Sequence, residues 1–146
     1  MALTFQLDSR LRADTIKQGE SQLNLLLLLN DQRYPWCILV PKVAGVTEIF
    51  QLSGVQQQQL MAESSELSKA LTALFKPDKI NIGALGNIVN QLHVHHLARF
   101  KKDPAWPGPV WGHSPAINYT KSELIDIQNK LRNSPLQHTF SFADDS

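Results

Sequence analysis

The sequence of 146 residues has one cysteine, no long apolar run and no excess of charge of one sign. Cys37 has no second cysteine to pair with, so a disulfide within the chain is excluded, which fits a reducing compartment. The most apolar run, residues 25–29, is far shorter than the roughly 20 residues of a membrane-spanning helix. The first ten residues lack the cationic start and apolar stretch of a secretory signal. We therefore expect a cytoplasmic protein without a membrane partner.

The charges nearly cancel, with 14 Lys and Arg against 13 Asp and Glu. This balance argues against nucleic acid as the main partner and leaves small ligands and proteins. The length predicts a single domain, residues 1–146, that buries roughly two thirds of the surface of its unfolded chain. A core of that size needs neither a disulfide nor a structural metal for ordinary stability.

The first third of the chain predicts a short helix and then a hairpin. Apolar residues between positions 5 and 19 follow Asp8, a possible helix cap, and Gly19 is expected to end this helix. Residues 23–29 and 36–40 are apolar runs separated by a brief connection, which predicts two paired strands.

The remaining two thirds predict longer helices and further strands. Ser53 is a suitable cap for a long amphipathic helix, and Thr120 with Glu123 forms a capping box for a second one. The expected elements are, in order, a helix at residues 54–75, strands at 79–85 and 88–97, and a helix that ends near residue 133. Strands with short connections and helices between or beside them favour an α+β fold with an antiparallel sheet.

Three of the five histidines fall within residues 91–97. If this segment is a strand, its period of two places Gln91, His93 and His95 on one face, while the apolar residues between them face a core. His96 breaks the alternation, which indicates either a buried histidine with satisfied hydrogen bonds or a β-bulge.

Three explanations fit this row of imidazoles. The rings can be ordinary surface or core histidines, or two of them can chelate zinc, which then needs a ligand such as His113, His138 or Cys37. The third explanation is nucleophilic catalysis, in which one neutral imidazole attacks and its neighbours hold the charged groups. A row of imidazoles fills a core poorly, so we favour the third explanation, which needs no metal and no cofactor.

The segment Gln-Leu-His-Val-His-His-Leu-Ala-Arg at residues 91–99 resembles the signature strand of the histidine triad (HIT) superfamily, in which three histidines alternate with apolar residues. The order of the expected elements over about residues 5–105 is also similar to that family. The chain resembles bacterial HIT hydrolases more than the uridylyltransferase or phosphorylase branches, because the third position is His95 and not glutamine. The resemblance implies a sheet of about five strands with one long helix packed on it, and shorter N- and C-terminal helices.

The resemblance also implies an activity and assigns the histidines their roles. His93, at the middle position, would attack the α-phosphorus of a nucleotide and form a covalent nucleotidyl-histidine that water then cleaves. His95 would hydrogen-bond phosphate and help the leaving group, and Gln91 at the first position would donate an amide hydrogen bond. The implied reaction cleaves a P–O bond, as in a dinucleoside polyphosphate, or a P–N bond, as in a nucleoside phosphoramidate.

Further residues are carried over from the family as a substrate site. Gly86 and Asn87 would bind phosphate oxygens, and Asn30 or Asp31 would contact the ribose. The base would lie against apolar residues from the N-terminal segment and the first apolar strand: Phe5, Leu7, Leu11 and Leu28. Family members are commonly homodimers, so a homodimer is expected.

Two departures from the family pattern leave an alternative open. Gln91 replaces the first histidine and cannot carry a proton or a positive charge. Trp36 stands where better-known branches often have a histidine. The alternative is therefore a nucleotide-binding or sensor module on the same fold that has lost useful turnover.

The last third of the sequence gives weaker signals. Residues 103–112 are rich in proline, but two tryptophans favour an ordered loop that covers the nucleotide site, contacts a second subunit or clamps the sheet. After the core at residues 5–105, the C-terminal loop and helix are expected over residues 106–133. Residues 134–146 carry no chemical signal and are expected to be a frayed end.

Overall fold

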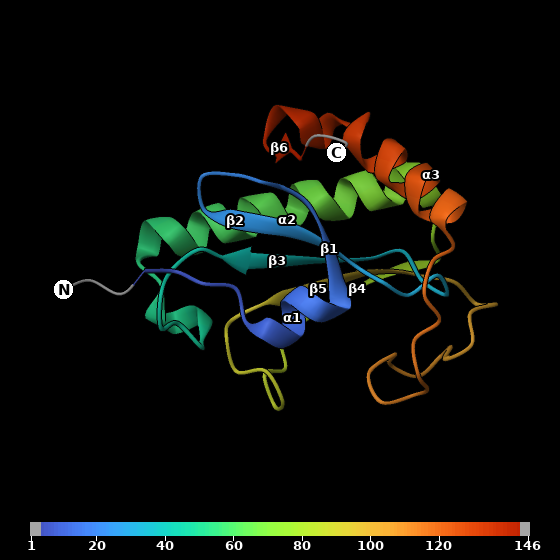
Figure 1. The fold of residues 1–146 in the computed structure, drawn as a ribbon, viewed down its shortest axis with the longest axis horizontal. Coiled ribbons are helices and arrows are strands. Elements are labelled where there is room, and N and C mark those ends of the chain that lie inside the picture. Colours follow the sequence, from blue (N-terminus) through green and yellow to red (C-terminus); the bar gives the residue numbers. More distant parts are fainter. Residues whose placement is uncertain (1–3, 144–146) are drawn as a thin grey trace.

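The computed structural model describes residues 4–143 and has at its centre an antiparallel sheet of six strands in the order β4-β5-β3-β2-β1-β6 (Figure 1). The strands are β1 Thr15–Glu20, β2 Asn24–Leu29, β3 Trp36–Pro41, β4 Lys79–Gly83, β5 Val94–Arg99 and β6 Ser141–Phe142. The helices are α1 Ser9–Asp14, α2 Gly54–Phe75 and α3 Lys121–Arg132, with short 3-10 helices at Ile49–Gln51 and Pro135–His138. The α+β class with one long helix and shorter terminal helices is confirmed.

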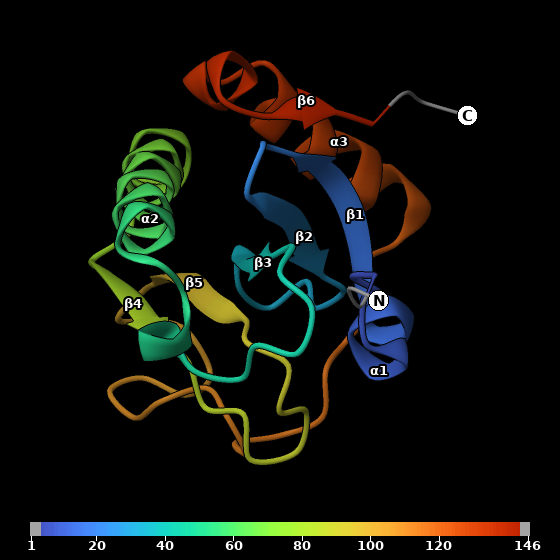
Figure 2. The same ribbon diagram turned by 90° about the vertical axis from the view of Figure 1, so that its left-hand side faces the viewer.

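Apolar residues cover both faces of the central strands. On one face, α2, α3 and the C-terminal segment enclose a core that includes Leu26, Leu28 and Leu39. On the other face, α1 and the loops enclose a second core with Leu27 and Ile38 (Figure 2). Because alternate residues of a strand point to opposite faces, an unbroken apolar run is what a strand with two covered faces requires.

The long helix begins and ends where local sequence signals place it. Ser53 Oγ accepts a hydrogen bond from the Gln56 main-chain N–H (3.1 Å), and the Gln56 side chain accepts one from the Ser53 N–H (2.9 Å). The chain leaves the helix through Lys76 in a left-handed conformation, with φ at 51°. The predicted span of residues 54–75 is confirmed.

The first helix is shorter than the sequence pattern predicts. It ends at Asp14, and residues 15–20 form β1, which pairs with β2 on one side and with β6 on the other. A side chain at Gly19 would place its Cβ 2.4 Å from the Ser141 carbonyl oxygen. Gly19 therefore permits a close strand contact and does not end a helix.

The C-terminal segment is also more ordered than expected. Residues 135–138 form a 3-10 helix, Ser141 and Phe142 pair with β1, and the side chains of Leu136 and Phe140 are buried in the core beside α2. The prediction of a frayed end from residue 134 is wrong as far as residue 143, and residues 144–146 lie outside the described part. Between residues 4 and 143, no helix has both the length and the apolar character needed to cross a membrane.

The fourth expected strand begins later than the sequence predicts. β5 starts at Val94, and residues 84–93 form a loop on the face opposite α2. The alternation of side chains between the two faces of the sheet still extends back to residue 92, because Leu92 and Val94 lie in the core beside α2. His93 and His95 both line the cavity on the opposite face.

Candidate active site

A cavity of about 530 Å³ lies on the face of the sheet opposite α2. Its size is within the range of small-molecule sites. Six of the site residues predicted from the sequence line it: Leu11, Asp31, Gly86, Asn87, His93 and His95. The structure adds Arg33, Trp36, Ile38, Trp111 and Ser114 to this lining.

His93 is held by a main-chain carbonyl. Its Nδ1 lies 2.7 Å from the carbonyl oxygen of Gln91, and the residue is 7% exposed. A carbonyl only accepts hydrogen bonds, so Nδ1 carries the proton of the neutral ring and Nε2 has a free electron pair. An unprotonated imidazole nitrogen is chemically able to act as a nucleophile.

His95 is held by the indole ring of Trp36. The Trp36 Nε1–H donates a hydrogen bond of 2.9 Å to His95 Nδ1, and both residues are buried. An indole N–H only donates, so Nδ1 is unprotonated and the neutral ring carries its proton on Nε2. Burial, and then the neighbouring His93 and His96, lower the pKa of His95 to about 3. At neutral pH the ring is therefore an uncharged hydrogen-bond donor.

His96 belongs to the other face of the sheet and to the core. Its Nε2 lies 2.7 Å from Ser64 Oγ on α2, and its Nδ1 lies 3.0 Å from the Val94 carbonyl oxygen. Burial lowers the pKa of His96 to about 4, although the bond to Val94 acts in the opposite direction. Of the two readings of this residue, the buried histidine with satisfied hydrogen bonds is confirmed.

Gln91 lies in the loop before β5 and not on the strand face that the sequence pattern predicts. Its Oε1 accepts a hydrogen bond from the Asp8 N–H (2.9 Å), and its Nε2 donates one to the Gln6 carbonyl (2.8 Å). The side chain thus ties the segment before α1 to the loop that carries His93. Gln91 lines a smaller neighbouring cavity of about 210 Å³ and not the one that contains His95.

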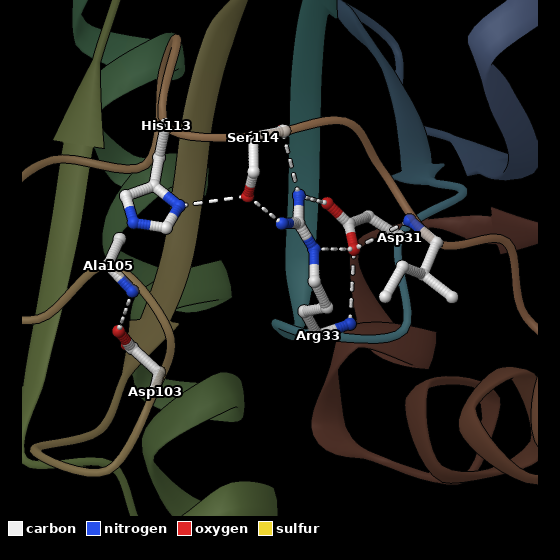
Figure 3. A network of polar contacts seen from close by, with 7 residues as sticks. Asp31, Arg33, Asp103, Ala105, His113 and Ser114 are labelled. Carbon is white, nitrogen blue, oxygen red and sulfur yellow. Dashed lines mark hydrogen bonds and ion pairs between the residues drawn. The ribbon is translucent and has the colours of Figure 1, made fainter.

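The turn after β2 uses its polar side chains to hold the segment at residues 114–119. Asn30 Oδ1 accepts a hydrogen bond from the Tyr119 N–H (2.9 Å), and Asn30 does not line the cavity. The Asp31 carboxylate binds the Arg33 guanidinium through Nε (2.9 Å) and Nη2 (2.8 Å). The same guanidinium donates to Oγ and to the carbonyl oxygen of Ser114 (Figure 3). Both oxygens of Asp31 therefore have protein partners, and Arg33 links this turn to Ser114.

The apolar residues that were expected to surround the nucleotide base lie on two different faces of the sheet. Leu11 lines the cavity, but Leu28 is buried in the core beside α2 and does not line it. The correction follows from the period of β2, because its neighbours Leu27 and Leu29 lie on the cavity side. Phe5 and Leu7 pack against the cavity-side core.

The loop at residues 103–112 is an ordered wall of the cavity, in which Trp111 lies edge-on to His95 with ring centroids 5.4 Å apart. Arg99, on the cavity face of β5, anchors this loop by a buried ion pair with Asp103 (2.8 Å) and a hydrogen bond to the Gly108 carbonyl (2.8 Å). The guanidinium also lies 5.7 Å from the Trp106 ring centroid. The loop both clamps the sheet and borders the site.

Zinc ligation by the histidine row would need a third side chain within reach. Among residues 4–143, no group of three or more His, Cys, Asp or Glu side chains is arranged to hold a metal ion. Cys37 is buried beneath α2, in the core on the far side of the sheet from the cavity. The His95 Nε2–H is able to donate to a ligand group that accepts hydrogen bonds.

Comparison with known proteins identifies the family. A HIT domain is matched over residues 10–102. A histidine triad protein from Marinobacter aquaeolei is 52% identical, with a TM-score of 0.88 over 89% of this chain and 95% of its own. A histidine triad protein from Bradyrhizobium japonicum is 45% identical, with a TM-score of 0.87 over 89% and 97%. One from Sinorhizobium meliloti is 44% identical, with a TM-score of 0.85 over 88% and 95%.

No curated protein matches the chain. The matched domain covers more than half of the sequence and contains both cavity histidines. The chain belongs to the histidine triad family.

Proposed function

We propose that this protein is a nucleotide hydrolase or transferase that cleaves a P–O or P–N bond at the α-phosphate of a nucleoside monophosphate moiety. The observation that carries the proposal is the hydrogen bond from His93 Nδ1 to the Gln91 carbonyl, because it leaves Nε2 unprotonated in a cavity of suitable size. Binding alone does not require such a nitrogen.

The proposed reaction has two displacement steps. His93 Nε2 attacks the α-phosphorus, a P–N bond forms, and the leaving group departs with the electrons of its bond to phosphorus. Water then attacks the nucleotidyl-histidine, the P–N bond to His93 breaks, and the nucleoside monophosphate is released. When another acceptor replaces water, the same intermediate gives transfer.

The groups around His93 have separate roles in these steps. His95 donates a hydrogen bond to a phosphoryl oxygen as its negative charge grows. Gly86 and Asn87 supply further polar groups to the cavity lining, and Gly86 has the positive φ of 76° that makes a tight turn there possible. Leu11, Trp36 and Trp111 supply apolar and aromatic surface for the base.

The experiment measures release of nucleoside monophosphate by chromatography. Diadenosine polyphosphates and adenosine phosphoramidate serve as substrates, and the wild type and His93→Ala are compared with and without EDTA. We expect the wild type to release AMP in EDTA and the variant to release essentially none. Equal release by His93→Ala would overturn the role of His93.

Two other results would favour the competing functions. Tight nucleotide binding without product in either protein would favour the non-catalytic binding module. Loss of wild-type activity in EDTA, restored by zinc, would favour a zinc hydrolase.

A further inference from the structure

We propose that Trp36 is a positioning residue that keeps the proton of His95 on Nε2, so that His95 always presents an N–H to the cavity. No role for this tryptophan follows from the triad motif, because Trp36 lies on β3, 59 positions before His95. The catalytic consequence rests on the proposed function, whereas the position of the proton does not.

The contact between the two side chains leaves one arrangement of protons. The indole Nε1–H donates to His95 Nδ1 over 2.9 Å, and Trp36 and His95 are 7% and 8% exposed. A proton on Nδ1 would face the indole proton, and both donors would lose their partner. A flipped imidazole would place a carbon against the indole N–H and leave that donor buried without an acceptor.

The surrounding rings restrict such a flip. The His95 ring lies edge-to-face with Trp36, Trp111 and His93, with centroid distances of 5.6, 5.4 and 4.8 Å. Trp36 itself is fixed on β3, which pairs with β5, and its ring contacts those of Tyr34 and Trp111 at 6.2 and 6.3 Å. Donor and acceptor are therefore both held in place before a ligand arrives.

The fixed proton restricts what His95 does in the reaction. A neutral imidazole with its proton on Nε2 stabilises a phosphoryl oxygen by hydrogen bonding, but it is a very weak acid. The low pKa of the ring also argues against an imidazolium that would protonate the leaving group. In this account the proton taken up by the leaving group comes from water and not from His95.

The test uses Trp36→Phe, which keeps an aromatic ring and removes the N–H, with Trp106→Phe as the matched control. Trp106 does not line the cavity. Nitrogen-15 NMR of histidine-labelled protein reports which ring nitrogen carries the proton. We expect His95 to be protonated on Nε2 in the wild type and in Trp106→Phe, and to populate the Nδ1-protonated form in Trp36→Phe.

The kinetic readout should separate kcat from KM. We expect kcat of Trp36→Phe to fall at least about tenfold with little change in KM, a smaller effect than loss of a complete oxyanion donor. A wild-type His95 protonated on Nδ1, or an unchanged tautomer in Trp36→Phe, would overturn the proposal. The NMR result stands without turnover, so it is distinguishable from failure of the proposed function. If Trp36→Phe does not fold, a wild-type His95 protonated on Nδ1 still overturns the proposal.

Discussion

His93 and His95 lie with their ring centroids 4.8 Å apart, and their hydrogen bonds place the proton on opposite nitrogens of the two rings. The carbonyl of Gln91 holds the proton of His93 on Nδ1, whereas the indole of Trp36 holds that of His95 on Nε2. The pair therefore offers one electron pair and one N–H to the same cavity. That combination suits attack on phosphorus beside a phosphoryl oxygen whose charge increases.

Replacing His95 distinguishes a hydrogen-bond donor from a proton donor. We expect His95→Gln to keep kcat within about tenfold of the wild type, because its amide still donates, and His95→Leu to lose about 10²–10³-fold. Both values come from steady-state kinetics on the best substrate of the panel. Equal losses in the two variants would contradict the donor role.

Restoring the family residue at position 91 should not improve this protein. We expect Gln91→His to lower the free energy of unfolding by about 0.5–1.5 kcal/mol, because an imidazole ring holds its donor and acceptor nitrogens at other positions than the terminal amide, so the bonds to Asp8 and Gln6 are not both kept. Its kcat/KM should not rise above that of the wild type. Urea unfolding and initial rates measure the two effects, and a more stable or faster variant would refute the structural role of Gln91.

Because His95 and His96 are buried, we expect the free energy of unfolding to fall in mild acid. The pKa values of about 3 for His95 and about 4 for His96 lie below the ordinary value near 6.5, so between these limits the unfolded chain binds protons that the folded chain does not. Stability is fully present above about pH 6.5 and falls by about 1.4 kcal/mol per pH unit for each histidine as the pH drops below it.

Urea unfolding at pH 7, 6 and 5 measures this slope. The window ends above the range in which ordinary carboxyl groups titrate. His96→Leu removes one of the two groups, so we expect its slope to be about half that of the wild type. An unfolding free energy that does not change between pH 7 and pH 5 would be inconsistent with neutral buried rings.

Because the Arg99–Asp103 ion pair is buried beneath the loop at residues 103–112, we expect the substitution of Asp103 to lower the free energy of unfolding strongly. Asp103→Ala leaves the Arg99 guanidinium buried without its carboxylate, since both side chains are 2% exposed. We expect a loss of about 3–5 kcal/mol in the free energy of unfolding. Lys130→Ala, which breaks an exposed ion pair with Asp126, is the control and should cost less than about 1 kcal/mol. Similar losses in the two variants would contradict the anchoring role of Arg99.

Elements defined by local signals could be predicted from the sequence. The capping boxes at Ser53 and Thr120 mark the starts of α2 and α3, and the apolar runs mark β2 and β3. β1 and β6 could not be predicted in this way, because β6 has only two residues and β1 contains a register shift between Lys17 and Gly19. The pairing of β6 with β1 also joins segments that are distant in the chain.

In the candidate active site, too, features set by local sequence were predictable and contacts between distant residues were not. The period of two in the signature segment indicates that His93 and His95 share a face, and the cavity contains both. The contacts of Gln91 with the segment before α1 span 83 and 85 positions, and Trp36 reaches His95 across 59. No local pattern encodes such contacts, so the sequence alone could not show that Gln91 supports the fold or that Trp36 orients His95.

The most direct test of nucleophilic catalysis by His93 is to trap the covalent intermediate. The enzyme is mixed with substrate and quenched within one turnover, and its peptides are analysed by mass spectrometry under conditions that preserve P–N bonds. We expect a nucleoside monophosphoryl group on His93 in the wild type and none in His93→Ala. Modification of another residue, or product release by the wild type without any modified His93, would contradict it.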